Sequence, residues 1–514
     1  MNETLQKKVE LLNSQMVVNQ SSDQSHISHR FFLPEGIESL TISFSYSPKF
    51  VEYGPENQEI VRKAFDFYDD KLAKNKKVIK DFSPFKNLLT ISIEDTIGFR
   101  GNCHRFHPEG YEIHVSDENS TPGVLNREMK SGMWTITINC HCILSETCDV
   151  QLIVHGTQSI NQDKRWYNKP FEDIKKIDFT TNKESKIPSK NSAYSWKRSE
   201  IHCHTNHSDG VQTVEELVSK ANELNISCLA ITDHNTMSAT EKLEQLEATY
   251  GVKLMRGIEW TTFYGHMLTL GYDQLTAINW SNVGPTSIEE SIQEVKKEGA
   301  IVGIAHPYQL GSPFCTGCYW EYETLNLDYY DFIEVWNGEN PHISRINKAA
   351  FETWTELLNQ GARIPATCGR DWHVNETSKQ LAFLYLYLPE NPTIVDMRQA
   401  IKRGNSFVSM GPQIEFNAAN EYISGDVLSV HNQDQINVQV DISEYNDSYA
   451  IVIDSNVGAV YRNDCEGDIR QAVEVKTNID SQQVTWIRLL VYSDRRELIA
   501  FTNPIYFEAE TYES

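Results

Sequence analysis

Between residues 200 and 373, metal-capable side chains repeatedly follow short apolar runs of the sequence. In chain order these residues are His202, His204 and Asp209, then Asp233 and His234, then Glu259 and His266, then His306, and finally Asp371 and His373. With 16 His in 514 residues, one such group is expected by accident, but an ordered series is not. Parallel strands of a β/α fold bring their carboxyl ends to one mouth, so we expect these side chains to meet there. The series predicts a metallohydrolase.

The mixture of imidazole and carboxylate indicates what kind of metal site this is. Imidazole suits Zn, Fe and Mn, and carboxylates such as Asp209, Glu259 and Asp371 can bridge two ions. Alternate residues of a strand point to the same side, so His202 and His204 are expected to project together. Mixed ligation without thiolate fits a catalytic cluster better than a closed structural zinc site.

Several residues have plainer interpretations. A lone His such as His234 is more often a core or turn residue than a ligand. The CTGC segment at 315–318 lacks a second CxxC, so we interpret it as a loop element near the mouth of the site rather than a metal or redox motif. Three histidines ahead of the series are expected to be surface or sandwich residues: His104, His107 and His114.

Charge and cysteine usage narrow the function classes. The net charge of −25 would repel a polyanion, so we expect no nucleic-acid partner, whereas a local metal cluster attracts a small anionic substrate.

Several of the ten cysteines lie inside apolar runs, which fits reduced thiols in a cytoplasmic protein. The first residues lack the apolar stretch of a secretory signal, and no run approaches the ~20 apolar residues of a membrane span, so we expect no membrane association. Homo-oligomer formation stays open.

Periodicity divides the chain into four segments. Residues 1–156 and 411–514 alternate apolar and polar positions between turn signals, which predicts an N-terminal and a smaller C-terminal β-sandwich. Residues 157–195 are polar and lysine-rich and are expected to be a linker. Residues 196–410 alternate strands and helices, which predicts an α/β fold with a parallel sheet or barrel. One of these helices has a predicted capping box at Thr213 and Glu216.

The motifs of residues 196–410 resemble the PHP (polymerase and histidinol phosphatase) domain, and within that superfamily they look most like the CehA/McbA-like branch of metallohydrolases. The segments that carry the resemblance are EIHCHTNHSDG (200–210), AITDHNT (230–236), GIEW (257–260), GHMLTLG (265–271), IAHP (304–307), IEVWNG (333–338) and CGRDWH (368–373). The flanking segments TPGVL, SGMW and TNPIYF look like the domains that accompany this branch.

The resemblance implies a distorted (β/α)7 barrel, flanked here by the two β-sandwiches, that holds two or three divalent ions. The implied first ion takes His202, His204, Glu259 and Asp371. The implied second ion shares Glu259 and adds His266 and His306. The implied third ion takes Asp209, His234 and His373. Asp209 stands where the wider family often has His, and a carboxylate is an acceptable ligand there. Zn, Mn or Fe would suit these ligands.

The resemblance, together with a metal pair suited to phosphoryl oxygens, implies hydrolysis of a small phosphate mono- or diester by a hydroxide that bridges two metals. Glu259, Asp371 and Arg370 are the candidate catalytic residues, with Arg370 offering a planar fork of donors to a phosphate. A surface or salt-bridging role for Arg370 is the alternative. Asn337 is expected to contact substrate or to shape its loop, and four aromatic residues to line or pack the mouth: Trp260, Tyr308, Trp336 and Trp372.

Two other functions stay open at this point. A carboxylic-ester, amide or carbamate hydrolase is implied by the CehA/McbA-like resemblance. A non-catalytic, metal-stabilised scaffold is the second alternative, in which the sandwiches would bind a glycan or a partner protein.

Overall fold

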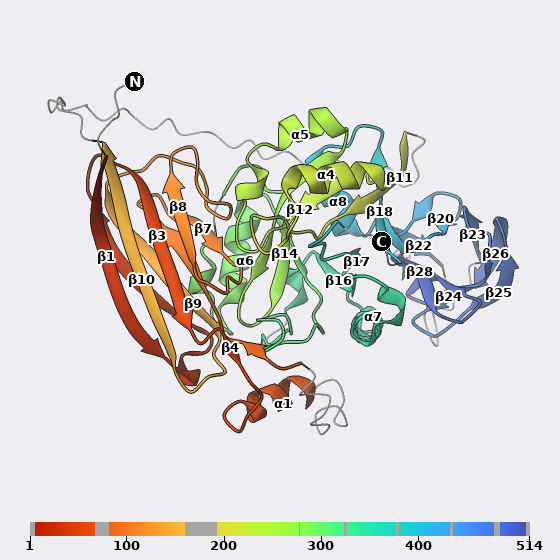
Figure 1. Ribbon diagram of the computed structural model, residues 1–514. Helices are drawn as coiled ribbons and strands as arrows, with labels where there is room; N and C mark the ends of the chain where they lie inside the picture. The colour runs from red at the N-terminus through yellow and green to blue at the C-terminus, as the bar shows by residue number, and fades with distance from the viewer. Residues whose placement is uncertain are drawn as a thin grey trace, which may run out of the picture.

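The computed structural model describes residues 6–66, 82–159, 193–276, 278–322, 326–375, 380–431, 435–476 and 484–509. Within these residues the protein is a mixed α/β structure, with the strands of the N-terminal segment at one end, the strands of the C-terminal segment at the other, and the helices gathered mainly between them (Figure 1). Most of the expected linker, residues 160–192, lies outside the described part of the chain. No described helix is both long enough and apolar enough to cross a membrane.

The N-terminal segment forms two antiparallel sheets, each four-stranded in the described part of the chain. The first has the order β1 (Gln6–Val18), β10 (Cys148–Ser159), β3 (Ile37–Ser47) and β8 (Tyr111–Ser116). The second has the order β2 (Ser25–Leu33), β9 (Gly132–Cys142), β6 (Leu88–Glu94) and β7 (Phe99–Cys103). Side chains of both sheets share one apolar core, which includes Phe44, Ile91, Ile138 and Leu152. In the first sheet, burial alternates along β3, which places Leu40, Ile42 and Phe44 on the side of this core.

A short outlying element accompanies this segment. Strands β4 (Phe50–Val51) and β5 (Phe85–Lys86) pair with each other, and α1 (Gln58–Asp66) follows β4. Val61 and Phe65 of α1 pack in a small separate core with Phe85 and Leu144.

The central segment begins with a run of neighbouring strands in sequence order, β11 to β17. Their bounds are β11 Tyr194–Glu200, β12 Cys228–Ile231, β13 Lys253–Thr261, β14 His266–Leu270, β15 Ile301–Ile304, β16 Phe332–Asn337 and β17 Ala366–Gly369. The run curves back on itself, because Cys203 after β11 and Trp372 after β17 form a parallel bridge.

Strand β14 runs antiparallel to both of its neighbours, whereas the other pairs between β11 and β17 are parallel. Only residues 262–265 connect β13 to β14, and a parallel neighbour would need a much longer crossover. The expectation of a parallel sheet over residues 196–410 is therefore wrong at β14. It is also wrong at β18 (Phe383–Pro389) and β19 (Ser406–Ser409), because β18 pairs antiparallel with both β11 and β19.

Helices connect most of the other strands of the central segment. They are α4 (Val214–Glu223), α5 (Leu243–Tyr250), α6 (Ile288–Lys297), α7 (Arg345–Asn359) and α8 (Ile394–Arg403). The predicted capping box of α4 is confirmed: the Thr213 side chain accepts from the Glu216 backbone, and the Glu216 side chain accepts from the Thr213 backbone. Leu217, Val218 and Ala221 form the buried side of this helix.

The central sheet continues into the C-terminal strands. β11 pairs with β18 (Phe383–Pro389), β18 with β19 (Ser406–Ser409), and β19 with β28 (Leu498–Thr502). Beyond β28 lie β27 (Trp486–Ser493), β24 (Ser448–Ser455) and β25 (Tyr461–Glu466), with β29 (Ile505–Ala509) and β22 (Val427–Val430) beside them. A second sheet contains β21 (Tyr422–Ile423), β20 (Gln413–Ala418), β23 (Gln435–Ser443) and β26 (Ile469–Lys476). Apolar side chains of both sheets share one core.

Candidate metal centre

The side chains of the predicted series lie together just beyond the ends of the central strands. His202 and His204 follow β11 rather than lying inside it, and Cys203 between them is buried with its sulfur directed at the Ala230 carbonyl. His234 follows β12, and Glu259 lies near the end of β13. The structure therefore brings together residues that are up to 171 positions apart in the sequence, from His202 to His373.

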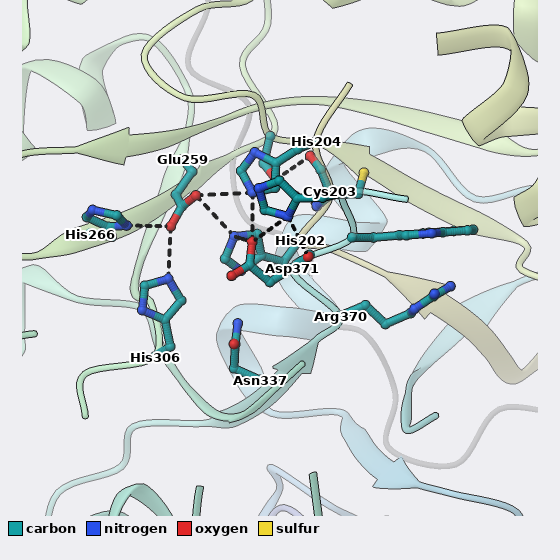
Figure 2. A network of polar contacts seen from close by, with 12 residues as sticks. His202, Cys203, His204, Glu259, His266, His306, Asn337, Arg370 and Asp371 are labelled. Carbon is teal, nitrogen blue, oxygen red and sulfur yellow. Dashed lines mark hydrogen bonds and ion pairs between the residues drawn. The ribbon is translucent and has the colours of Figure 1, made fainter. Parts of the chain in front are cut away.

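Glu259 is the residue around which the cluster is arranged (Figure 2). Its Oε2 lies 3.2 Å from Nε2 of His202 and 3.2 Å from Nε2 of His204. The same oxygen lies 3.1 Å from Nδ1 of His234. Its Oε1 lies 2.8 Å from Nδ1 of His266 and 2.9 Å from Nε2 of His306. One buried carboxylate thus contacts five imidazoles.

Asp371 closes the cluster on the side of β17. Its Oδ1 lies 2.9 Å from Nε2 of His204, 3.4 Å from Nε2 of His202 and 3.5 Å from Nδ1 of His373. The backbone φ is 51° at Asp371 and 26° at His306, a left-handed region that non-glycine residues rarely occupy. Such strain is typically held by the surrounding structure where function uses the side chain.

A further group lies on the more open side of the cluster. Oδ1 of Asp209 is 3.1 Å from Nε2 of His373 and 3.4 Å from Nε2 of His234. The Asp209 side chain is 34% exposed and that of His373 is 32% exposed, whereas those of His202 and His204 are fully buried. Small molecules would therefore reach the cluster from the side of Asp209 and His373.

These donors fit divalent metal ions. Sets of potential ligand atoms gather within 4.8 Å of one another, among them His202, His204, Glu259 and Asp371, and also His204, Asp209, His234 and His373. Nε2 of His202, Nε2 of His204 and Oε2 of Glu259 are buried and make no hydrogen bond within the described structure. A buried polar atom without a hydrogen-bond partner costs folding free energy, so such atoms are rare. Atoms of this kind that converge on one point are arranged as the ligands of a metal ion are.

The charges of the cluster support the same interpretation. Burial raises the pKa of Glu259, but His202, His234 and His266 together hold it well below its usual range. Burial lowers the pKa of His204, but Asp371 and Glu259 raise it to about 10. The carboxylates are therefore ionised at neutral pH, which is the form that binds a cation.

Two buried carboxylates beside the cluster were not identified from the sequence. Both oxygens of Glu334, on β16, lie 3.1 Å from Nδ1 of His202. Oε1 of Glu200 accepts hydrogen bonds from the backbone N–H groups of Ile201, His202 and Arg370, and burial raises the pKa of Glu200 to about 7. Glu334 is a lone acid in the apolar run FIEVW, and that pattern is a usable signal because buried Glu is rare unless paired. Glu200 follows Lys197, Arg198 and Ser199 and offers no such signal.

Asp233 has a different role from its neighbour His234. Its carboxylate accepts from the backbone N–H and the hydroxyl of Thr205 and from the hydroxyl of Ser208. It therefore shapes the turn that follows His204.

Arg370 points away from Glu259 and the histidines (Figure 2). Its guanidinium lies 3.9 Å from the ring centroid of Trp372 and 3.7 Å from the Glu339 carboxylate. This placement agrees with the salt-bridging alternative, and contact with a phosphate stays a prediction. Asn337 donates from Nδ2 to Glu334 at 3.3 Å, so it helps to hold that carboxylate.

The aromatic residues expected at the mouth are mostly packed inside. Trp260, Trp336 and Trp372 are each at most 2% exposed, and Trp336 packs on Phe501. Their observed role is packing below the cluster.

The CTGC segment contacts the cluster directly. Cys315 and Cys318 form a disulfide, and Nε2 of His266 donates to the Thr316 carbonyl at 2.8 Å. The expectation of reduced thiols is therefore wrong for this pair, whose Cα atoms are 5.6 Å apart, within reach of a disulfide. The other cysteines are free thiols.

His104 also departs from expectation. It follows β7, is only 9% exposed, and its ring centroid lies 4.5 Å from that of His234. Burial lowers the pKa of His104 to about 3, so the imidazole is neutral. The surface alternative is wrong for His104, whereas its ring does pack on His141 of the N-terminal sheets, at a centroid distance of 5.0 Å. It also reaches His234 because the N-terminal sheet docks against the cluster. His114 on β8 is exposed, as expected.

Two known proteins are similar to parts of this chain in sequence. A stretch of 152 residues, 27% of this chain, is 28% identical to "Uncharacterized protein MJ1587" of Methanocaldococcus jannaschii and covers 82% of that protein. A stretch of 82 residues, 15% of this chain, is 32% identical to a 5'-3' exoribonuclease of Haemophilus influenzae and covers 30% of it.

Among solved structures, one similar chain comes from Bacteroides vulgatus and is described as a two-domain protein containing a predicted PHP-like metal-dependent phosphoesterase. It is 15% identical, with a TM-score of 0.37, and the match covers 63% of this chain and 100% of that one. The family model of the PHP domain matches residues 200–310, which include His202, His204, His234, Glu259, His266 and His306. Residues 200–310 of this chain are therefore a PHP domain.

Proposed function

We propose that this protein is a metal-dependent phosphoesterase that hydrolyses a small phosphate mono- or diester. The observation that carries the proposal is the position of Glu259, with two oxygens shared among five imidazoles at the end of the PHP-domain strands. Divalent ions bound at these donors would supply an activated water and would polarise a phosphoryl group.

The chain's own residues have separate tasks in this proposal. Glu259 and Asp371 hold negative charge between the imidazoles and are the bridging candidates. Glu334 fixes the ring of His202, and the Thr316 carbonyl fixes that of His266. The partly exposed Asp209 and His373 mark the side from which substrate enters. We assign two or three ions to the donor sets that the family resemblance implies, with Zn, Mn or Fe as the candidate metals.

The substrate class rests on two arguments. A pair of metals suits the oxygens of a phosphoryl group, and the Haemophilus influenzae relative is named as an exoribonuclease, an enzyme of phosphodiesters. The net charge of −25 disfavours a long polyanion, so a small anionic ester is the proposed substrate. A carboxylic-ester or carbamate substrate, as in the CehA/McbA-like branch, is the competing outcome of the test below.

We also propose an architecture for this function. Strands β11 to β17 would form a distorted (β/α)7 barrel within residues 196–410, with the N-terminal and C-terminal sheets acting as flanking β-sandwiches. The parallel bridge between Cys203 and Trp372 supports closure of the barrel.

The test uses the full chain, stripped with a chelator and reloaded with Mn²⁺ or Zn²⁺. The panel contains p-nitrophenyl phosphate, bis-p-nitrophenyl phosphate, p-nitrophenyl acetate and an aryl carbamate. We expect metal-dependent cleavage of a phosphate ester. Full activity in the stripped protein would refute metal dependence, and cleavage of only the acetate or carbamate would replace the proposed substrate class.

A matched pair of variants checks the role of the cluster. Glu259→Gln should lose metal and rate by more than the roughly 10- to 100-fold typical when a partner of a ligand is removed. Glu290→Gln, at an exposed position of α6, is the control and should retain both.

A further inference from the structure

The second N-terminal sheet meets the central segment through a buried polar face. Nδ2 of Asn139 donates to Oγ1 of Thr90 at 3.1 Å and to Oγ of Ser92 at 3.0 Å. Thr90 also lies 2.8 Å from Nε2 of His141. From the central segment, Nε1 of Trp280 donates to Ser92 at 3.2 Å. A polar network of this kind fixes one docking geometry, because displaced partners would be left buried and unpaired.

The loop after β7 extends from this docked sheet to the metal centre. Arg105 donates from its guanidinium to the carbonyl of Gly210, the residue next to Asp209. His104 packs its ring against His234, and its electrostatic environment includes Asp209, His266 and Glu259. Two contacts therefore hold the loop at the rim of the cluster: Arg105 with the Gly210 carbonyl, and His104 with the ring of His234.

The ring of His104 packs between those of His141 on β9 and His234, with centroid distances of 5.0 and 4.5 Å, and these contacts leave one of its nitrogens unexplained. Nδ1 of His104 is buried and makes no hydrogen bond to any residue that the structure describes. Among the same residues, His104 belongs to none of the groups of converging metal donors. A buried donor or acceptor left unpaired costs free energy, and where a fold keeps one beside a functional site, a bound molecule is the expected partner.

We propose that His104 is a substrate-contacting residue, an imidazole supplied by the N-terminal sheets to hydrogen-bond an oxygen of the phosphate group held at the metal centre. The inference rests on the proposed phosphoesterase function. An imidazole carries an N–H donor in either protonation state, and donors preset at a phosphoryl oxygen stabilise the charge that develops there. The N-terminal sheets then form part of the active site.

The experiment measures binding of inorganic phosphate to the full chain loaded with Co²⁺, followed by the visible absorption of the metal. The variants are His104→Ala and His104→Gln, and His114→Ala is the control, an exposed histidine on β8 of the same sheets. We expect His104→Ala to bind as much Co²⁺ as wild type, with the same spectrum before phosphate is added. Its affinity for phosphate should fall by about 10- to 100-fold, the loss expected for a hydrogen bond to a charged group. His114→Ala should match wild type.

The outcomes separate this inference from the proposed function. Unchanged phosphate affinity in both His104 variants would overturn the inference alone. Loss of Co²⁺, or an altered spectrum before phosphate is added, would assign His104 to holding His234 and would also overturn it. If His104→Ala does not fold, His104→Leu takes its place, because leucine fills a similar volume and offers no hydrogen bond to phosphate. A wild-type chain that neither binds phosphate nor cleaves a phosphate ester would refute the proposed function itself.

Discussion

Nδ1 of His202 lies 3.1 Å from each carboxylate oxygen of Glu334, a residue that is fully buried on β16. The opposite nitrogen of the same ring, Nε2, faces Glu259 at 3.2 Å and Asp371 at 3.4 Å. One side of the imidazole is therefore directed at the metal donors and the other at a supporting carboxylate. Such a pairing sets the tautomer of a ligand histidine and increases its basicity.

Glu334→Gln should weaken metal binding without removing a ligand. The amide keeps the size of the side chain but loses the charge that polarises His202, so we expect an affinity about 10-fold lower. Competition with a fluorescent chelator of known affinity measures this, with the exposed Glu290→Gln as the control. Equal affinities in a folded Glu334→Gln protein would show that Glu334 does not tune His202.

Asp209→Asn should remove one metal rather than all of them. Asp209 contacts His234 and His373 on the open side. The donor set of His202, His204, Glu259 and Asp371 shares only His204 with the set that contains Asp209. We expect the metal content to fall by about one ion per chain, since a neutral amide is a much poorer ligand. Elemental analysis after dialysis measures the ratio, and Asp464→Asn, 84% exposed in its side chain, is the control. An unchanged ratio would count against a separate ion at Asp209.

The candidate ligand residues were accessible to sequence reasoning because their signals are local. His234 and Glu259 come at the end of apolar runs, His202 and Asp371 come just after β11 and β17, and the ends of adjacent strands meet in space. Glu334 was missed because it stands inside its strand. Its apolar neighbours indicate that it is buried, but only the fold shows that its partner is His202.

The role of His104 depends on docking, which the local sequence does not encode. The residue lies 130 positions before His234 in the chain, and only the packing of one sheet against the central segment brings the two rings together. The antiparallel direction of β14 was missed for a related reason. Its apolar pattern matches that of a parallel strand, and only the short connection from β13 distinguishes the two.

Asp23→Asn should stabilise the protein above neutral pH. Burial raises the pKa of Asp23 from 3.8 to about 7, and the hydrogen bond from the Ile143 backbone offsets only part of this. Between about pH 4 and pH 7 the folded chain keeps a proton that the unfolded chain has lost, so stability falls as the pH rises through this window. Asparagine carries no charge and keeps the oxygen that accepts from Ile143. We expect a higher melting temperature for Asp23→Asn at pH 8 and little difference at pH 4, with the exposed Asp149→Asn unchanged at both. The same shift at both pH values would exclude titration of Asp23 as the cause.

Asn503 connects the C-terminal strands to the strand that leads to Asp371, and its loss should destabilise the protein. Its Oδ1 accepts from the Ala366 backbone N–H at 2.7 Å, and its Nδ2 donates to the Ala366 carbonyl at 3.0 Å. Ala366 begins β17 and is fully buried, so Asn503→Ala leaves its N–H without this partner. We expect a loss of about 1–3 kcal/mol in the free energy of unfolding, measured by urea denaturation. Asn417→Ala is the matched control, because Asn417 is equally buried but its amide makes no hydrogen bond within the described structure. Equal losses in the two variants would mean that the volume of the side chain, rather than its pairing with β17, determines the effect.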